Sequence, residues 1–224
     1  MARVTLDLAT GRLMFDGTDL CALDGLVIKK ISETYSPHAL DRLEMLRVAE
    51  AKGVKIFSTP TSILRLMDRL TCTVTLANAG IPMPPTIITE DEPAAHDALA
   101  RFGTAVFKPL FSTKARGMIL LDHYAPDAQA QIAAFRAENP VMYIQQKADL
   151  SGQDLGMVFL GGKHLCTYSR VGQSGSWNTT IHAGGKYAPH DPDPALIELG
   201  HRAQAPFGLT FTTVDIALTP DGPI

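Results

Sequence analysis

The chain has 224 residues, of which 46% are hydrophobic and 19% charged, with a formal net charge of −3 at pH 7. This composition excludes a disordered or collagen-like protein and provides enough apolar residues for a hydrophobic core. Because Lys and Arg are not in excess, nucleic acid is not an expected partner. The longest uncharged stretch, residues 71–89, contains Pro82, Pro84 and Pro85, so no membrane-spanning helix is expected.

The N-terminus and the cysteines bear on the compartment. Asp7 precedes any apolar run of signal-peptide length, so we expect a cytoplasmic protein. Cys21, Cys72 and Cys166 are far apart and form no C-x-x-C pair, which predicts reduced, packed thiols. No feature of the sequence predicts the oligomeric state.

Residues 1–68 predict a partial N-terminal α/β lobe. Two short alternating runs around Ala9-Thr10-Gly11 indicate a hairpin. An amphipathic helix over 37–52 separates a buried strand at 26–28 from a second strand at 54–57. Lys29 and Lys30 follow the first of these strands and are expected to be an exposed strand end.

Residues 69–147 predict a second, small lobe that we expect to act as a lid. A helical pattern over 60–80, broken near Leu70, leads into it. Helices are expected between Thr89 or Asp91 and Gly103, and over 126–138. The ranges expected as strands are 86–89, 104–107, 118–121 and 141–145.

Residues 148–224 predict a third lobe with an antiparallel sheet. Gly161-Gly162 joins the runs 155–160 and 163–169 in a hairpin, because paired glycines permit a tight turn. A polar loop is expected over 171–187, a helix over 193–205 and a strand over 211–218. Residues 219–224 resemble a turn and the start of a returning strand, so we expect this lobe to be truncated.

Familiar nucleotide and metalloprotease motifs are absent: the chain has no P-loop, no G-x-G-x-x-G and no H-E-x-x-H. An ordered series of other motifs is present. It consists of M-D-R-L (67–70) with A-N-A-G-I-P-M-P (77–84), V-F-K-P-L-F-S-T-K-A-R-G-M (106–118), Y-I-Q-Q-K-A-D (143–149), G-Q-D-L-G (152–156), H-A-G-G-K (182–186) and V-D-I (214–216).

In this order the motifs resemble the ATP-grasp superfamily, and within it the RimK-like carboxylate-amine ligases. The chain is also similar to the ATP-grasp proteins of the GAK gene systems. The resemblance implies an α/β (α+β) ATP-grasp fold, in which two α+β lobes enclose ATP and a partial N-terminal α/β lobe precedes them.

The resemblance implies a phosphate site in the lid lobe. Lys108, at a strand end, would place a point charge beside the α- and β-phosphates. The loop around Thr113 and Gly117 would close over the phosphates with backbone N–H groups, although Ser112 and Ala115 stand where relatives usually have glycine. Arg69 stands where relatives commonly carry a phosphate-binding lysine.

The adenosine end of ATP is expected at the hinge. Gln145, Gln146 and Lys147 match the segment whose main chain reads the adenine edge, with Gln146 in place of a frequent glutamate. Asp154 matches the family's acidic ribose ligand.

The third lobe is expected to hold the metal and the reacting carboxylate. Asp215 matches the first ligand of Mg²⁺, with Mn²⁺ as an alternative, and two further ligands are expected beyond residue 224. Arg170, Asn178 and Lys186 match the residues around the acyl phosphate and substrate. His182 is more simply a hydrogen-bonded loop residue.

The expected activity is an ATP-dependent, ADP-forming ligation. A small-molecule or peptide carboxylate would be activated as an acyl phosphate, and its acyl group would be transferred to an amine acceptor. The present chain alone is expected to be inactive. Two alternatives stay open: an ATP-grasp kinase, and a non-catalytic nucleotide-binding partner protein.

Overall fold

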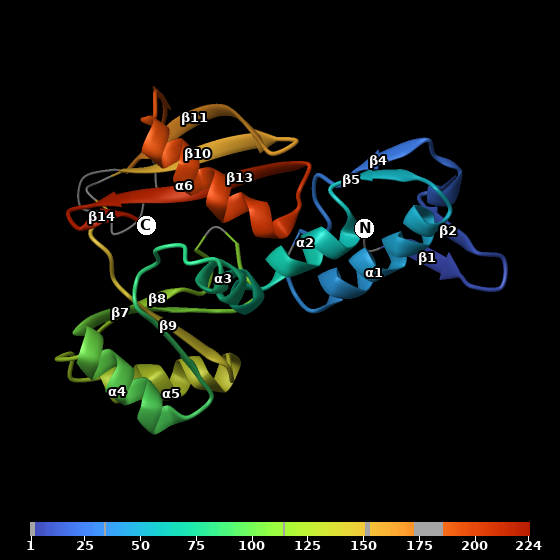
Figure 1. Cartoon of the computed structure of the whole chain (residues 1–224). Helices are drawn as coiled ribbons and strands as arrows, with labels where there is room; N and C mark the ends of the chain where they lie inside the picture. The colour runs from blue at the N-terminus through green and yellow to red at the C-terminus, as the bar shows by residue number, and fades with distance from the viewer. Residues whose placement is uncertain (1–2, 34, 114, 151–152, 173–185) are drawn as a thin grey trace.

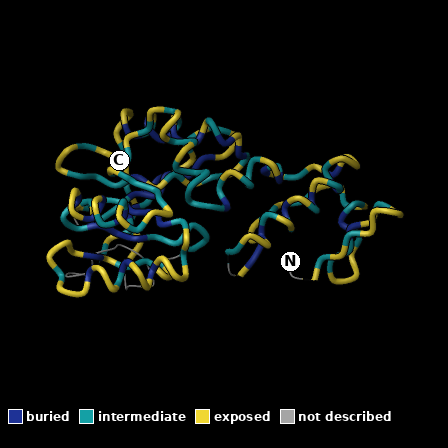
Figure 2. Tube along the Cα trace, turned by 90° about the horizontal axis from the view of Figure 1, so that it is seen from below, coloured by how far each residue is buried: buried dark blue, intermediate teal, exposed yellow. Residues whose placement is uncertain are grey.

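The structure is a computed structural model that describes residues 3–33, 35–113, 115–150, 153–172 and 186–224. Figure 1 shows three groups of elements, with the N-terminal group extending to one side of the other two, as the second view also shows (Figure 2). Asn178 and His182 lie outside the described residues. Within the described part of the chain, no helix has both the length and the apolarity needed to cross a membrane.

The N-terminal group combines two small sheets with two helices. Its elements are β1 (Val4–Asp7), β2 (Arg12–Phe15), β3 (Thr18–Asp19), β4 (Gly25–Val27), α1 (His38–Ala51), β5 (Lys55–Phe57) and α2 (Pro60–Met67). The first three strands form an antiparallel sheet, while β4 and β5 pair in parallel. The predicted hairpin, the helix and both strand positions are confirmed, but the first strand is not buried, since Val27 on β4 is 69% exposed. The core of this group includes Leu13, Leu43 and Leu46.

A single residue separates α2 from α3 (Arg69–Asn78). Asp68 has extended backbone angles, and its Oδ1 accepts a hydrogen bond from the N–H of Thr71. Asp68 therefore ends one helix and caps the next, which confirms the predicted break near Leu70.

The lid group is a four-stranded antiparallel sheet covered on one face by two helices (Figure 1). Its elements are β6 (Thr86–Thr89), α4 (Glu92–Phe102), β7 (Thr104–Lys108), β8 (Ile119–Asp122), α5 (Ala128–Glu138) and β9 (Met142–Gln146). The strand order is β6-β9-β7-β8. Phe107, Ile132 and Ile144 lie in the core between helices and sheet.

The C-terminal group contains a five-stranded antiparallel sheet in the order β12-β11-β10-β13-β14. Its elements are β10 (Gln153–Leu160), β11 (Lys163–Val171), β12 (Lys186–His190), α6 (Pro194–Gln204), β13 (Phe211–Thr219) and β14 (Gly222–Pro223). Leu155, Met157 and Phe159 alternate onto the face that packs against α6. The predicted hairpin at Gly161-Gly162 is confirmed.

Two expectations for this group are wrong. The predicted polar loop over 171–187 is wrong at both ends, because Val171 belongs to β11 and residues 186–187 belong to β12, which pairs with the edge of β11. Its sequence, K-Y-A-P-H, has no clear strand pattern, so the strand depends on this tertiary pairing. Cys166 is exposed rather than packed, because it shares the sheet face turned away from α6.

Gly200 fixes the distance between α6 and β10. A Cβ built on this buried glycine would lie 2.7 Å from Sδ of Met157 and 2.9 Å from Cζ of Phe159. We expect Gly200→Ala to destabilise the fold by about 1–2 kcal/mol, because overpacking outweighs the higher helix propensity of alanine. Urea unfolding tests this, and a variant as stable as the wild type would contradict it.

Candidate functional site

The helix-free face of the lid sheet carries a polar cluster. Along β7 and β9, Phe107 and Ile144 point into the helix-covered core, so Lys108, Tyr143 and Gln145 share the other face. Lys108 lies directly opposite Tyr143. In Figure 1, α4 and α5 lie below this sheet and the C-terminal group lies above it, so the cluster faces that group.

Hydrogen bonds hold Lys108 in place. Its Nζ donates to Oε1 of Gln145 at 2.5 Å, and the amide of Gln145 donates to the hydroxyls of Thr86 at 2.9 Å and Tyr143 at 3.3 Å. The Tyr143 hydroxyl lies 2.9 Å from that of Thr73 on α3. The ammonium is therefore positioned by three strands and a helix.

Arg69 provides a second cation at the start of α3. Its guanidinium carbon lies 5.7 Å from the centre of the Tyr143 ring, and Nζ of Lys108 lies 6.0 Å from the same centre. Within the described ranges, neither cation forms an ion pair with a carboxylate. Two partly buried positive charges without a negative partner favour an anionic ligand.

Burial shifts the pKa of both cations. It lowers the pKa of Lys108 to about 8, with the charge of Arg69 as a second cause. Burial also lowers the pKa of Arg69, whereas Tyr143 and Cys72 act in the opposite direction.

On the expectation that Lys108 holds phosphate groups of a nucleotide, nucleotide affinity should fall as the pH rises above about 8. Protonated Lys108 attracts phosphate, so loss of its proton should weaken binding by up to about tenfold per pH unit. Calorimetric titration with Mg·ADP from pH 7 to 9.5 measures this, with Lys108→Arg as the control that stays charged. A wild-type affinity independent of pH would contradict the assignment.

Arg69 also anchors the loop that follows β7. Its backbone N–H donates to the carbonyl of Leu110 at 3.0 Å, its Nε to that of Pro109 at 3.2 Å, and one terminal nitrogen to Oγ of Ser112 at 3.0 Å. The structure therefore shows a loop-positioning role for Arg69, and its expected phosphate role stays a prediction.

The loop itself contains two residues with left-handed backbone angles, Ala115 at φ +59° and Gly117 at φ +67°. Turn hydrogen bonds run from the N–H of Arg116 to the carbonyl of Thr113 and from the N–H of Met118 to that of Ala115. A Cβ on Gly117 would approach Cγ of Pro109 at 3.1 Å. The loop therefore has the geometry of a glycine-rich segment although Ala115 is not glycine.

Ala115→Gly is expected to stabilise the protein by about 0.5–1 kcal/mol. Removing the Cβ relieves the strain of the left-handed backbone, and this gain exceeds the cost of the greater freedom of glycine in the unfolded chain. Chemical denaturation measures the difference. Ala133→Gly, in the regular helix α5, is the control expected to destabilise. A destabilised Ala115→Gly variant would contradict the strain argument.

The hinge residues divide between the two faces of the lid sheet. Gln145 faces Lys108, and alternation places Gln146 on the opposite face. The backbone N–H of Gln146 donates to the carbonyl of Pro85 and that of Lys147 to the carbonyl of Thr104. The main-chain donors of Gln146 and Lys147 are therefore already used within the lid group.

A second charged cluster lies on the C-terminal sheet, on the face turned away from α6. Arg170 lies opposite Asp154, to which it donates two hydrogen bonds, and it also reaches Oδ1 of Asp215 at 2.9 Å. The side chains of Arg170 and Asp154 are 21% and 14% exposed, whereas that of Asp215 is 65% exposed. Asp215 is therefore the carboxylate open to a cation.

The charges in this cluster set its protonation. Burial alone would lower the pKa of Arg170. Its hydrogen bonds with Asp154 and the negative charges of Asp215 and Asp154 together have the larger effect, so this pKa is raised overall and the guanidinium stays protonated. Burial raises the pKa of Asp215, whereas the positive charge of Arg170 lowers it. The side chain of Asp215 is 65% exposed, which limits the effect of burial on this pKa.

Gly156 makes room for this cluster. It lies on β10 between Tyr168 on β11 and Asp215 on β13, and a Cβ at this position would overlap the Tyr168 ring. The ring can therefore cross the strand beside Asp215, where it also meets Tyr187 edge-to-face.

Lys186, another predicted site residue, lies apart from the cluster formed by Arg170, Asp154 and Asp215. Lys186 is exposed at the start of β12, and the register places it opposite Val171, on the other sheet face from Arg170. Within the described residues, no three His, Cys, Asp or Glu side chains come together as a metal site. Asp154 is engaged by Arg170, so a ribose would have to share its carboxylate.

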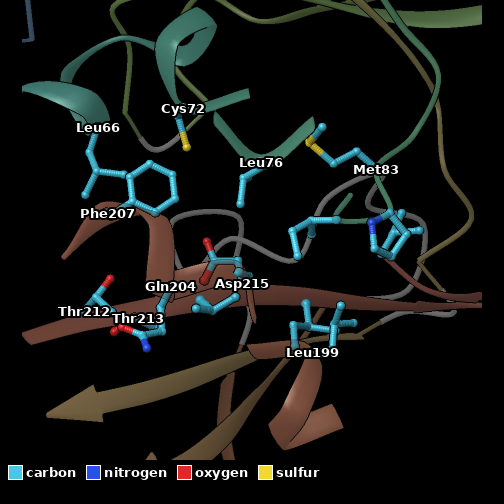
Figure 3. A pocket seen from close by; sticks show the side chains of 16 residues that line it. Leu66, Cys72, Leu76, Met83, Leu199, Gln204, Phe207, Thr212, Thr213 and Asp215 are labelled. Atoms are coloured by element: carbon cyan, nitrogen blue, oxygen red, sulfur yellow. The ribbon is translucent and has the colours of Figure 1, made fainter. Parts of the chain in front are cut away.

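An apolar cavity of about 260 Å³ adjoins Asp215, between α3 and the C-terminal sheet (Figure 3). Cys72 and Leu76 face it from α3, while Asp215 and Leu199 face it from the other side. Burial raises the pKa of the Cys72 thiol, so this thiol stays protonated.

Sequence reasoning missed Thr73, Thr86 and Tyr143, which support Lys108. The alternation of side chains along β9 could have indicated Tyr143, because this residue is two positions before Gln145 and therefore lies on the same face of the sheet. Thr73 and Thr86 have no such signal, since their roles arise from contacts between elements.

Comparison with known proteins gives a consistent result. Residues 66–224 match the model of the RimK-like ATP-grasp domain. The tetrahydromethanopterin:alpha-L-glutamate ligase of Methanosarcina acetivorans is 27% identical over 207 residues, which cover 88% of this chain and 64% of the relative. The chain therefore spans less than two thirds of the length of this relative.

Solved structures share the fold. The RimK domain ATP-grasp protein of Sphaerobacter thermophilus has a TM-score of 0.70 at 22% identity, covering 100% of this chain and 76% of its own. The ATP-grasp ligase PsnB, complexed with minimal precursor, Mg and ADP, has a TM-score of 0.68 at 18% identity, covering 98% and 72%. At these identities the likeness shows the α+β ATP-grasp fold.

Proposed function

Because the chain belongs to the RimK-like ATP-grasp family, we propose that it is part of an ATP-dependent carboxylate-amine ligase that forms ADP. The observation that carries this proposal is the pair of partly buried cations, Lys108 and Arg69, on the helix-free face of the lid sheet, for which the described residues provide no carboxylate partner. A triphosphate supplies the missing negative charge.

The proposed reaction has two steps. A substrate carboxylate oxygen attacks the γ-phosphorus of ATP, the bond to the β-phosphate oxygen breaks, and an acyl phosphate and ADP form. An amine nitrogen then attacks the acyl carbon, phosphate leaves with the C–O bonding electrons, and the nitrogen loses a proton. Glutamate ligases among the relatives support an amino acid or peptide as one reactant.

The side chains of this chain would act mainly by positioning and charge. Lys108 and Arg69 would hold phosphate oxygens, with the loop around Thr113 and Gly117 closing over them and excluding water. Arg170 would offset the charge of the transferred phosphoryl group. The backbone at 145–147 and Asp154 would contact adenosine.

The residues present fit Mg²⁺ as a companion of the nucleotide. Asp215 is a hard oxygen ligand and is 65% exposed, and Mg²⁺ is commonly held by one or two carboxylates together with phosphates. When bound, the ion would neutralise phosphate charge. The relative solved with Mg and ADP supports this assignment.

Three lobes with boundaries near residues 68 and 147 are part of the proposal, as is a cytoplasmic site of action. The buried clusters support the division, because they lie within residues 13–67, 95–144 and 155–216. Asn178 stays part of the proposed substrate site, whereas the register of β12 places Lys186 on the sheet face opposite to Arg170, so no role is proposed for its side chain.

Product analysis of the whole protein that contains this chain tests the proposed function, because the chain alone is expected to be inactive. ADP release should require both a carboxylate and an amine, drawn from a panel that includes L-glutamate as amine donor, and should be lost in Lys108→Met. A stable phosphorylated product from one acceptor would identify a kinase. Absence of turnover with nucleotide binding retained would favour the non-catalytic alternative.

A further inference from the structure

A second cavity, of about 140 Å³, lies where the N-terminal and C-terminal groups meet. The segment that follows β4, the helix α2 and the start of β13 contribute to its walls. It shares Leu66 and Thr212 with the larger cavity beside Asp215, so the two cavities adjoin.

Polar contacts fix this junction. The Ser58 hydroxyl accepts hydrogen bonds from the N–H groups of Thr210 and Phe211 at 3.0 and 3.4 Å, and Arg65 donates to the carbonyl of Pro206 at 3.0 Å. These hydrogen bonds to the Ser58 hydroxyl join the N-terminal group to the C-terminal group. The polar side chains left to a ligand are Lys29, Lys30, Tyr35 and Thr212.

The charge of the second cavity is positive. Lys29 and Lys30 line it and are both exposed, while no carboxylate is among its described lining residues. In the part of the chain that the structure describes, neither lysine forms an ion pair. Glu33, the nearest carboxylate in sequence, is exposed outside the lining.

We propose that this second cavity binds a carboxylate group of an acidic amino acid or peptide substrate through Lys29, Lys30 and the Tyr35 hydroxyl. The inference rests on the proposed ligase function, because it places the reacting end of the same substrate near Asp215. Ile28, Leu66 and Phe211 supply apolar walls for the aliphatic part of the substrate, which a small inorganic anion would not use.

Binding of the dipeptide L-glutamyl-L-glutamate, measured by calorimetry in the presence of Mg·ADP, tests this site. Wild-type protein should bind it, and Lys29→Ala/Lys30→Ala should bind at least about tenfold more weakly because two charged hydrogen-bond donors are lost. The matched control is Lys55→Ala/Lys163→Ala, which removes two exposed lysines outside the cavity and should bind like wild type.

The outcomes separate this inference from the proposed function. Normal Mg·ADP binding with dipeptide binding unchanged in Lys29→Ala/Lys30→Ala would overturn the site alone. No dipeptide binding by the wild type, or equal competition by inorganic phosphate at the same concentration, would also overturn it. Loss of Mg·ADP binding in the wild type would instead count against the proposed function.

Discussion

Lys108→Met is expected to weaken Mg·ADP binding by at least about 100-fold, because it removes the central charge of the lid-sheet cluster while keeping the apolar stem. Arg69 alone should not compensate, since three of its donor groups hold the loop over 109–112. Isothermal titration calorimetry gives the two dissociation constants directly.

Stability distinguishes this loss from unfolding. The folded-state pKa of Lys108 is about 8, below the ordinary 10.5, so its charged form costs stability below pH 8 and that cost disappears as pH rises from 8 toward 10.5. Lys108→Met should therefore melt no lower than the wild type at pH 7. Lys163→Ala is the surface control, and equal nucleotide affinity in Lys108→Met and the wild type would refute the site.

Arg170→Met is expected to reduce ADP-forming turnover by at least about 100-fold and to destabilise the protein by about 1–3 kcal/mol. The stability loss follows because Asp154, 14% exposed, would lose both hydrogen bonds from Arg170. Denaturant unfolding and product formation measure the two effects separately.

A second substitution separates the two roles of Arg170. Arg170→Met/Asp154→Asn also removes the negative charge of the largely buried Asp154, so it should recover much of the stability but none of the turnover. Recovery of turnover together with stability would mean that Arg170 acts only as a structural partner of Asp154.

Local sequence signals predicted most of the elements. Helix starts follow side-chain caps, such as Asp91 before α4 and Asp68 before α3, and the Gly161-Gly162 turn fixes the hairpin of β10 and β11. These signals act over a few residues, so they can be read without knowledge of the tertiary structure. β12 could not be predicted in this way, because it is stabilised by pairing with β11.

The candidate site was predictable only as separate residues. Motif order indicated Lys108, Asp154, Arg170 and Asp215, but the ion pairs joining the last three depend on strand register and on the space left by Gly156. The positive cavity containing Lys29 and Lys30 was also hidden in the sequence. Lys29 and Lys30 line this cavity because the fold places the start of β13 beside them.

An isotope-transfer measurement tests the central claim most directly. The carboxylate that supports ADP release is labelled with ¹⁸O in both oxygens, and the phosphate produced is analysed by mass spectrometry. An acyl phosphate intermediate predicts one ¹⁸O atom in the phosphate, because the attacking oxygen stays on phosphorus when the amine displaces it. Unlabelled phosphate, or AMP in place of ADP, would contradict the proposed chemistry.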